Sequence, residues 1–150
     1  NGFVTVGNEK MSKSLGNFVT LRSMLDRHDP EVVRVFLLSK QYREPLNYDD
    51  ASIGEAQKRV ERWRALTTQI ERSSHGHTAG AALAAPVCPA RDAFWAALDN
   101  DFDFGRALVA IDDALETGAR LHGADAATVL AFLREASAAL GILWSLEADA

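Results

Sequence analysis

A short run of cations and hydroxyls near the start of the chain has the composition of a polyphosphate-binding loop. The run is Lys10-Met11-Ser12-Lys13-Ser14, and it is followed directly by Leu15-Gly16-Asn17. Lysine ammonium groups act as point charges toward phosphate oxygens, and hydroxyl and backbone N–H groups can donate to the oxygens that remain. The closing glycine favours a turn. We call residues 10–17 the lysine loop and predict that it contacts a polyphosphate.

The lysine loop resembles the second signature of class I aminoacyl-tRNA synthetases, the KMSKS loop that stabilises the ATP pyrophosphate during amino-acid activation. Residues 2–18 as a whole are similar to the cysteinyl-tRNA synthetase version of this loop. Two later stretches also resemble that family: residues 38–48, with the pattern Tyr-Arg-x-Pro-Leu-Asn-Tyr, and residues 97–103. The likeness is strongest in residues 1–50 and weaker after about residue 105.

The resemblance implies ATP-dependent attachment of L-cysteine to tRNA(Cys) through cysteinyl-adenylate, with ATP as a substrate that is used together with Mg. Attack by the cysteine carboxylate on the α-phosphorus expels pyrophosphate, so cations must meet the charge that builds on the leaving group. By position in the motif, Lys13 is the first candidate for this catalytic contact and Lys10 the second. Ser12 and Ser14 are expected to support them as hydroxyl donors to the ATP phosphates.

A class I synthetase also needs a catalytic core with a His-x-Gly-His signature before the lysine loop, and this chain lacks it. We therefore expect a C-terminal fragment, from the lysine loop through the helical domain, that is inactive alone. The anticodon-binding domain of the family is also expected to be missing. His75, His77 and Cys88 match no common zinc spacing. We predict no metal in this chain, with any zinc confined to the missing core.

Two alternatives remain open. One is a fragment of the related cysteine ligase of mycothiol biosynthesis, although Leu15 and the Tyr-Arg-x-Pro-Leu-Asn-Tyr stretch favour the synthetase. The other, of a different class, is a non-catalytic helical module that binds tRNA or a protein partner. An in-frame upstream catalytic core would distinguish the enzyme from the module.

Composition and charge limit the classes of protein and partner that fit this chain. The 150 residues carry a net charge of −5 and are 47% hydrophobic, and they contain no apolar run long enough to span a membrane. The single cysteine fits a reducing compartment, so we expect a cytoplasmic protein. Residues 1–75 hold 12 of the 16 Lys and Arg against 10 acids, and residues 76–150 hold 4 against 11. A nucleic acid is therefore expected on the first half.

Three cations on one predicted long helix are candidate tRNA contacts: Lys58, Arg59 and Arg62. Lys58 and Arg62 are four residues apart and share a face. Because Glu55 and Glu61 interleave with them, ion pairing within the helix explains the pattern equally well.

The hydrophobic pattern predicts a mainly α protein, an antiparallel helical bundle preceded by a short β/loop arm that carries the lysine motif. We divide it into residues 1–46, the loop and a stem-contact-like segment, and residues 47–150, the bundle. A strand is expected at residues 3–6, a short helix capped by Thr20, and a helix that starts at Asp29-Pro30 and is buried nearly all round. A long helix is expected from residues 47–50 to about 73, with Trp63 in its apolar stripe. Another is expected after Pro89, with Phe94, Trp95 and Leu98 facing inward. The last two are expected over residues 105–122 and after Asp125, which caps its helix. Apolar surface uncovered by truncation makes a dimer possible.

Overall fold

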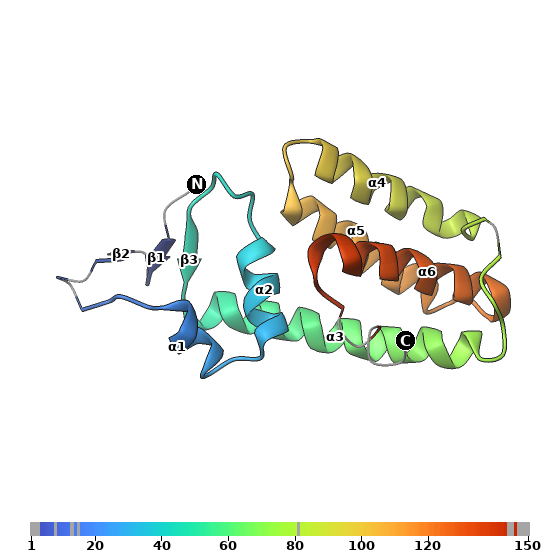
Figure 1. Ribbon diagram of the computed structural model, residues 1–150, viewed down its shortest axis with the longest axis horizontal. Helices are drawn as coiled ribbons and strands as arrows, with labels where there is room; N and C mark the ends of the chain where they lie inside the picture. Colours follow the sequence, from blue (N-terminus) through green and yellow to red (C-terminus); the bar gives the residue numbers. More distant parts are fainter. Residues whose placement is uncertain are drawn as a thin grey trace.

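A computed structural model describes residues 4–7, 9–12, 14, 16–80, 82–143 and 146. The molecule is elongated, with a small sheet and one short helix at one end and a helical bundle over the rest of its length (Figure 1). The helices α3 to α6 reverse direction from each one to the next (Figure 1). This confirms the prediction of a mainly α, antiparallel bundle behind a short β arm. The domain division after residue 46 stays a prediction.

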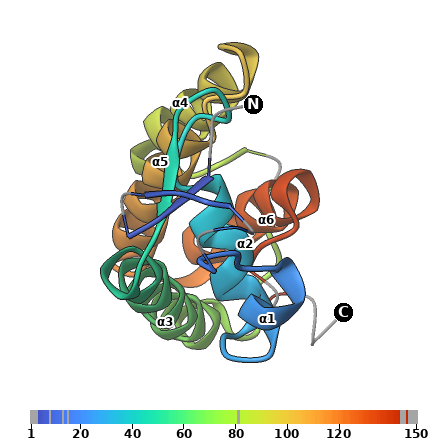
Figure 2. The same cartoon turned by 90° about the vertical axis from the view of Figure 1, so that its left-hand side faces the viewer.

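The arm is a hairpin that gains a third strand from later in the chain. Strands β1 (Val4–Val6) and β2 (Glu9–Lys10) pair antiparallel around Gly7, whose φ of 57° suits a residue without a side chain. Strand β3 (Leu46–Tyr48) pairs parallel with β1, so the sheet order is β2-β1-β3 (Figure 1). Figure 2 views the molecule from the end that carries this sheet. Our expectation that residues 47–48 open the long helix is therefore wrong. Pairing with a strand some 40 residues away overrides the local pattern.

Two helices connect β1 to β3. Helix α1 (Leu21–Leu25) begins at Thr20, which forms the predicted cap through a reciprocal pair of hydrogen bonds with Ser23. Helix α2 (Pro30–Leu38) begins at Asp29, whose Oδ1 accepts the Glu31 backbone N–H at 2.8 Å. Four apolar residues of α2 are buried as predicted: Val32, Val33, Val35 and Phe36. Leu37, however, is 45% exposed, so the prediction that this helix is buried nearly all round is wrong.

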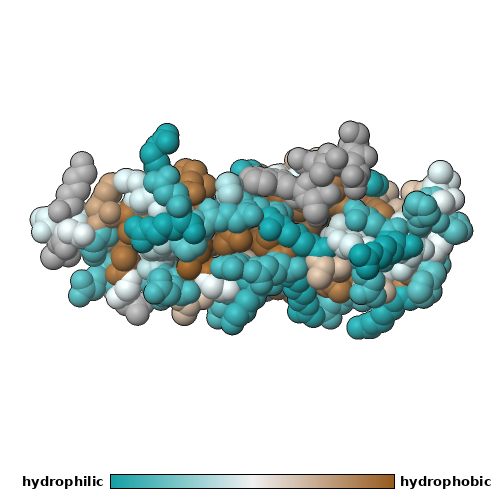
Figure 3. Space-filling view, turned by 90° about the horizontal axis from the view of Figure 1, so that it is seen from below, coloured by the Kyte–Doolittle hydropathy of each residue, from teal (hydrophilic) through white to brown (hydrophobic). Residues whose placement is uncertain are grey.

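Helix α3 (Asp50–Ser74) runs along the length of the bundle (Figure 1). It begins at Asp49, whose carboxylate accepts the Ser52 backbone N–H at 2.8 Å. The predicted apolar stripe is confirmed, because all its members are buried: Ile53, Ala56, Val60, Trp63, Thr67 and Ile70. The outer side of the molecule that Figure 3 shows is covered mainly by hydrophilic side chains, as expected for an amphipathic helix at the surface.

The last three helices are α4 (Cys88–Asp99), α5 (Phe104–Gly118) and α6 (Gly123–Leu140), and a short 3-10 turn, η1 (Ala85–Val87), precedes α4. Phe94 is fully buried as predicted, whereas Trp95 is 39% exposed, because α4 packs only one face against α5. The residue that precedes α6 is His122, so Asp125 lies in the first turn and is not the predicted cap.

Helix α2 also closes the end of α6. The Arg34 Nε donates to the Leu140 carbonyl oxygen at 2.7 Å, where Gly141 ends the helix with a φ of 63°. A cation at this position satisfies an otherwise free carbonyl and faces the negative end of the helix dipole. The segment that follows the lysine loop is thereby attached to the C-terminal part of the bundle.

Candidate nucleotide-binding loop and basic helix face

One side chain closes the lysine loop. The Asn17 Oδ1 accepts the Ser12 backbone N–H at 2.8 Å, and the Asn17 Nδ2 donates to the Lys10 carbonyl oxygen at 3.2 Å. Gly16, with a φ of 67°, turns the chain just before Asn17. The Ser12 and Ser14 hydroxyls lie 2.7 Å apart. The loop therefore has a defined closure that brings the two predicted hydroxyl donors together.

The structure describes three of the four predicted site residues of this loop. Lys10 ends strand β2 and is exposed, as is Ser14, whereas Ser12 is half-buried. Lys13, our first candidate, lies outside the described residues. Asn17 was absent from the predicted site, although an amide side chain directly after the loop glycine was a signal that could have pointed to it.

The arm is joined to the start of α3 by a chain of hydrogen bonds. The Thr5 hydroxyl donates to the Asn47 Oδ1 at 2.9 Å, and the Asn47 Nδ2 donates to the Asp49 Oδ2 at 2.6 Å. The hydrogen bond from the Ser52 backbone N–H holds the pKa of Asp49 below its ordinary value. Strand β3 also packs on α2, where the rings of Phe36 and Tyr48 contact each other edge to face with their centroids 5.9 Å apart. The sheet that carries the loop is thus fixed to both α2 and α3.

Two stretches that resemble the same family meet at Asp101. Its carboxylate accepts from the Arg43 Nη2 at 3.2 Å, from the Tyr42 hydroxyl at 2.9 Å and from the Gln41 Nε2 at 3.2 Å. The Arg43 Nε lies 2.9 Å from the Asp101 Oδ2 as an ion pair. The hydrogen bond from Arg43 lowers the pKa of Asp101. Asp101 and Phe102 both have left-handed backbone, with φ values of 54° and 55°. These contacts tie the segment before β3 to the turn between α4 and α5.

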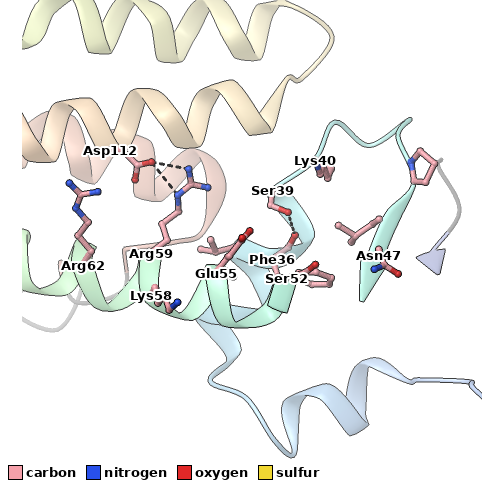
Figure 4. A pocket seen from close by; sticks show the side chains of 14 residues that line it. Phe36, Ser39, Lys40, Asn47, Ser52, Glu55, Lys58, Arg59, Arg62 and Asp112 are labelled. Carbon is pink, nitrogen blue, oxygen red and sulfur yellow. Dashed lines mark hydrogen bonds and ion pairs between the residues drawn. The ribbon is translucent and has the colours of Figure 1, made fainter. Parts of the chain in front are cut away.

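The basic face of α3 is paired across helices. The Arg59 Nη2 lies 2.8 Å from the Asp112 Oδ2 on α5 (Figure 4). Arg62 forms an ion pair with Glu116, which also lies on α5. The indole N–H of the buried Trp63 donates to the other Asp112 oxygen at 2.6 Å. The pairing that we considered within α3 is therefore formed mainly between α3 and α5.

A groove of about 500 Å³ lies beside these residues, bounded by the end of α2, strand β3, the first half of α3 and Asp112 (Figure 4). Lys40 and Lys58, both exposed, line it from α2's end and from α3, and Glu55 also faces it. Of the three predicted tRNA contacts, Lys58 is the one for which no ion pair is found among the described residues. The groove thus offers cations at two of its edges.

Arg64, further along α3, has a structural role. Its Nη2 lies 2.9 Å from the Asp29 Oδ2 and 2.7 Å from the Glu31 Oε2, and Glu31 is only 1% exposed. Burial alone would raise the pKa of Asp29, but hydrogen bonds from Arg64 and from the Glu31 backbone N–H outweigh it and lower that pKa. This cluster holds the start of α2 against α3.

Within the described ranges, no group of three or more His, Cys, Asp or Glu is arranged to hold a metal ion. His75 and His77 lie in the turn after α3, where the His77 Nδ1 is 3.1 Å from the His75 carbonyl oxygen. None of the helices described is both long and apolar enough to cross a membrane.

Comparison with known proteins agrees with the resemblance. The family model for the catalytic domain of class I tRNA synthetases of the cysteine type, "tRNA synthetases class I (C) catalytic domain", matches residues 1–58. A cysteine–tRNA ligase of Dichelobacter nodosus is 38% identical over 143 residues, 95% of this chain and 29% of its own length. One from Halorhodospira halophila is 42% identical over 149 residues, 95% of this chain and 30% of its own. One from Syntrophobacter fumaroxidans is 43% identical over 119 residues.

The loop, the bundle behind it and these matches define a region of a class I aminoacyl-tRNA synthetase. Within that class, the chain corresponds to a region of the cysteinyl-tRNA synthetases. It spans about 30% of the length of the curated relatives that it matches most fully.

Proposed function

We propose that this chain is the part of a cysteine–tRNA ligase that brings the lysine loop to ATP and the helical bundle to tRNA(Cys). The observation that carries the proposal is the closed lysine loop, held by Asn17 and attached through β1 and β3 to the long helix α3. A loop on such a support can place cations on a polyphosphate repeatedly in one geometry.

In this proposal Lys13 and Lys10 neutralise charge on the pyrophosphate as it leaves the α-phosphorus of ATP. The Ser12 and Ser14 hydroxyls, 2.7 Å apart, can donate to neighbouring phosphate oxygens. The amino-acid pocket and the rest of the ATP site are assigned to other parts of the full-length protein. We therefore expect the 150 residues alone to be inactive.

The tRNA-binding part of the proposal rests on the groove beside α3. Lys58 and Lys40 supply cations that can follow an RNA backbone, and phosphate contacts of this kind position an RNA without reading its sequence. Arg59 and Arg62 already pair with α5, so a phosphate would have to share or displace Asp112 and Glu116. We expect their contribution to be smaller than that of Lys58.

The test is cysteine-dependent ATP–pyrophosphate exchange, measured on the full-length product of the gene and on the 150 residues in parallel. Exchange by the full-length protein, followed by cysteinylation of tRNA(Cys), is the expected result. Exchange without tRNA charging, but with transfer of cysteine to an amino sugar, would instead assign the chain to the related sugar ligase. A full-length protein without cysteine-dependent exchange would refute the enzymatic proposal.

A further inference from the structure

The Asn17 side chain forms two hydrogen bonds with the backbone of the lysine loop. The Asn17 amide accepts from the Ser12 backbone N–H and donates to the Lys10 carbonyl oxygen, at the opposite end of the loop in sequence. These groups flank Met11, and the side chain spans five and seven residues along the sequence to reach them. Asn17 is half-buried in this position.

An amide is the side chain that suits this position chemically. The backbone offers one N–H and one carbonyl oxygen, and a carboxamide carries the matching acceptor and donor two bonds apart. An aspartate could accept from Ser12 but could not donate to Lys10, and a serine is too short to contact both groups. Gly16, with its φ of 67°, turns the chain so that the Asn17 side chain faces back into the loop.

We infer that Asn17 is a positioning residue for the reaction, one that holds the backbone of Lys10 and Ser12 so that the loop cations meet the polyphosphate. This inference rests on the proposed function. Asn17 does not itself contact the nucleotide in this account. Its effect passes through the loop geometry, where a displacement of about 1 Å can lower a rate by about 100-fold.

The test is the Asn17→Ala variant of the full-length protein, assayed by ATP–pyrophosphate exchange. We expect kcat to fall about 10- to 100-fold while the KM for cysteine stays within about twofold. In a Lys10→Ala, Lys13→Ala background, Asn17→Ala should cause little further loss, because there are then no loop cations to position. The matched control is Asn100→Ala, an exposed asparagine after α4, which should leave exchange unchanged.

A kcat within twofold of the unsubstituted enzyme, or an equal further loss in the background without lysines, would overturn the inference. Hydrogen exchange of the Ser12 amide in the 150-residue chain separates this failure from failure of the proposed function, because it needs no activity. Asn17→Ala should accelerate that exchange at least about tenfold, and an unchanged rate would also overturn the inference. If Asn17→Ala does not fold, Asn17→Ser carries the same expectations.

Discussion

Three carboxylates hold separate parts of the chain together at the scale of single residues. Asp101 collects Gln41, Tyr42 and Arg43, Asp112 joins Arg59 to Trp63, and Glu31 accepts from Arg64. In each case the partner lies 33 to 60 residues away. Of these partners, Arg59 was predicted from the sequence to contact RNA or to pair within its own helix, because side-chain types and spacing report only local partners. The lysine loop was predictable because its chemistry lies in one continuous run.

Glu31 and Arg64 give the first prediction. Arg64→Ala should lower the free energy of unfolding by about 1–3 kcal/mol, because the buried Glu31 carboxylate loses a charged hydrogen bond. We expect a loss near the lower end of this range because the Arg64 side chain is partly exposed. Urea denaturation measures it. The control is Arg91→Ala on α4, which removes only an exposed pair with Asp92 and should cost less than about 0.5 kcal/mol.

The pH dependence of the same variant follows from Asp29. Its pKa is lower in the folded state than its ordinary value of 3.8, so its contribution to stability is present above that value and is lost as the pH falls through the folded pKa. Below about pH 4, unfolding free energy should therefore decline more steeply in the unsubstituted chain than in Arg64→Ala. Parallel slopes for the two chains would contradict this assignment.

Asp112 gives the second prediction. Asp112→Ala should cost about 1–3 kcal/mol, because the N–H of the buried Trp63 loses its acceptor. Asp112→Asn keeps an oxygen for the indole and loses only the charge that faces Arg59, so it should cost less than half as much. Equal losses in urea denaturation would mean that the ion pair, and not the indole hydrogen bond, is the main interaction.

At the scale of elements, the helices were more predictable than their surroundings. The stripe of α3 and the caps of α1 and α2 follow from local spacing and local hydrogen bonds. Strand β3 was missed because its partner is remote, and the exposure of Leu37 and Trp95 was missed because hydrophobicity alone does not tell which face meets a neighbour. Packing between α3, α5 and α6 likewise depends on a small residue that no local pattern singles out.

That residue is Gly118, at the end of α5. A Cβ there would lie 2.7 Å from the Val129 Cγ1 and 3.1 Å from the Ile70 Cδ1, both buried. Gly118→Ala should therefore lower the free energy of unfolding by about 1–3 kcal/mol, through overpacking of a stiff β-branched neighbour. Gly54→Ala is the control in α3, where a Cβ meets nothing within 4 Å, and it should stabilise by up to about 1 kcal/mol. Thermal unfolding of both variants measures the contrast.

At the scale of the whole molecule, the charge asymmetry of the sequence is partly neutralised in the fold. Arg59 and Arg62 belong to the basic half, and their partners Asp112 and Glu116 belong to the acidic half. Counting charges along the chain therefore overstates the cations available to RNA. We therefore propose that an RNA backbone contacts the groove beside α3, which Lys40 and Lys58 line. Dimerisation stays a prediction.

Salt-dependent binding of tRNA(Cys) tests this surface. Lys58→Ala should reduce the slope of log Kd against log salt by about 1, because one fewer phosphate is neutralised. Arg91→Ala, a cation of the acidic half that pairs with Asp92, should leave the slope unchanged. Identical slopes for Lys58→Ala and the unsubstituted protein would exclude Lys58 as a phosphate contact.

Cysteine-dependent ATP–pyrophosphate exchange in the full-length Lys13→Ala variant tests whether the lysine loop serves cysteine activation. Loss of a cation that stabilises the leaving group should reduce kcat by about 100-fold or more, with little change in the KM for cysteine. An exchange rate equal to that of the unsubstituted enzyme would contradict the claim and leave the loop without a part in the chemistry.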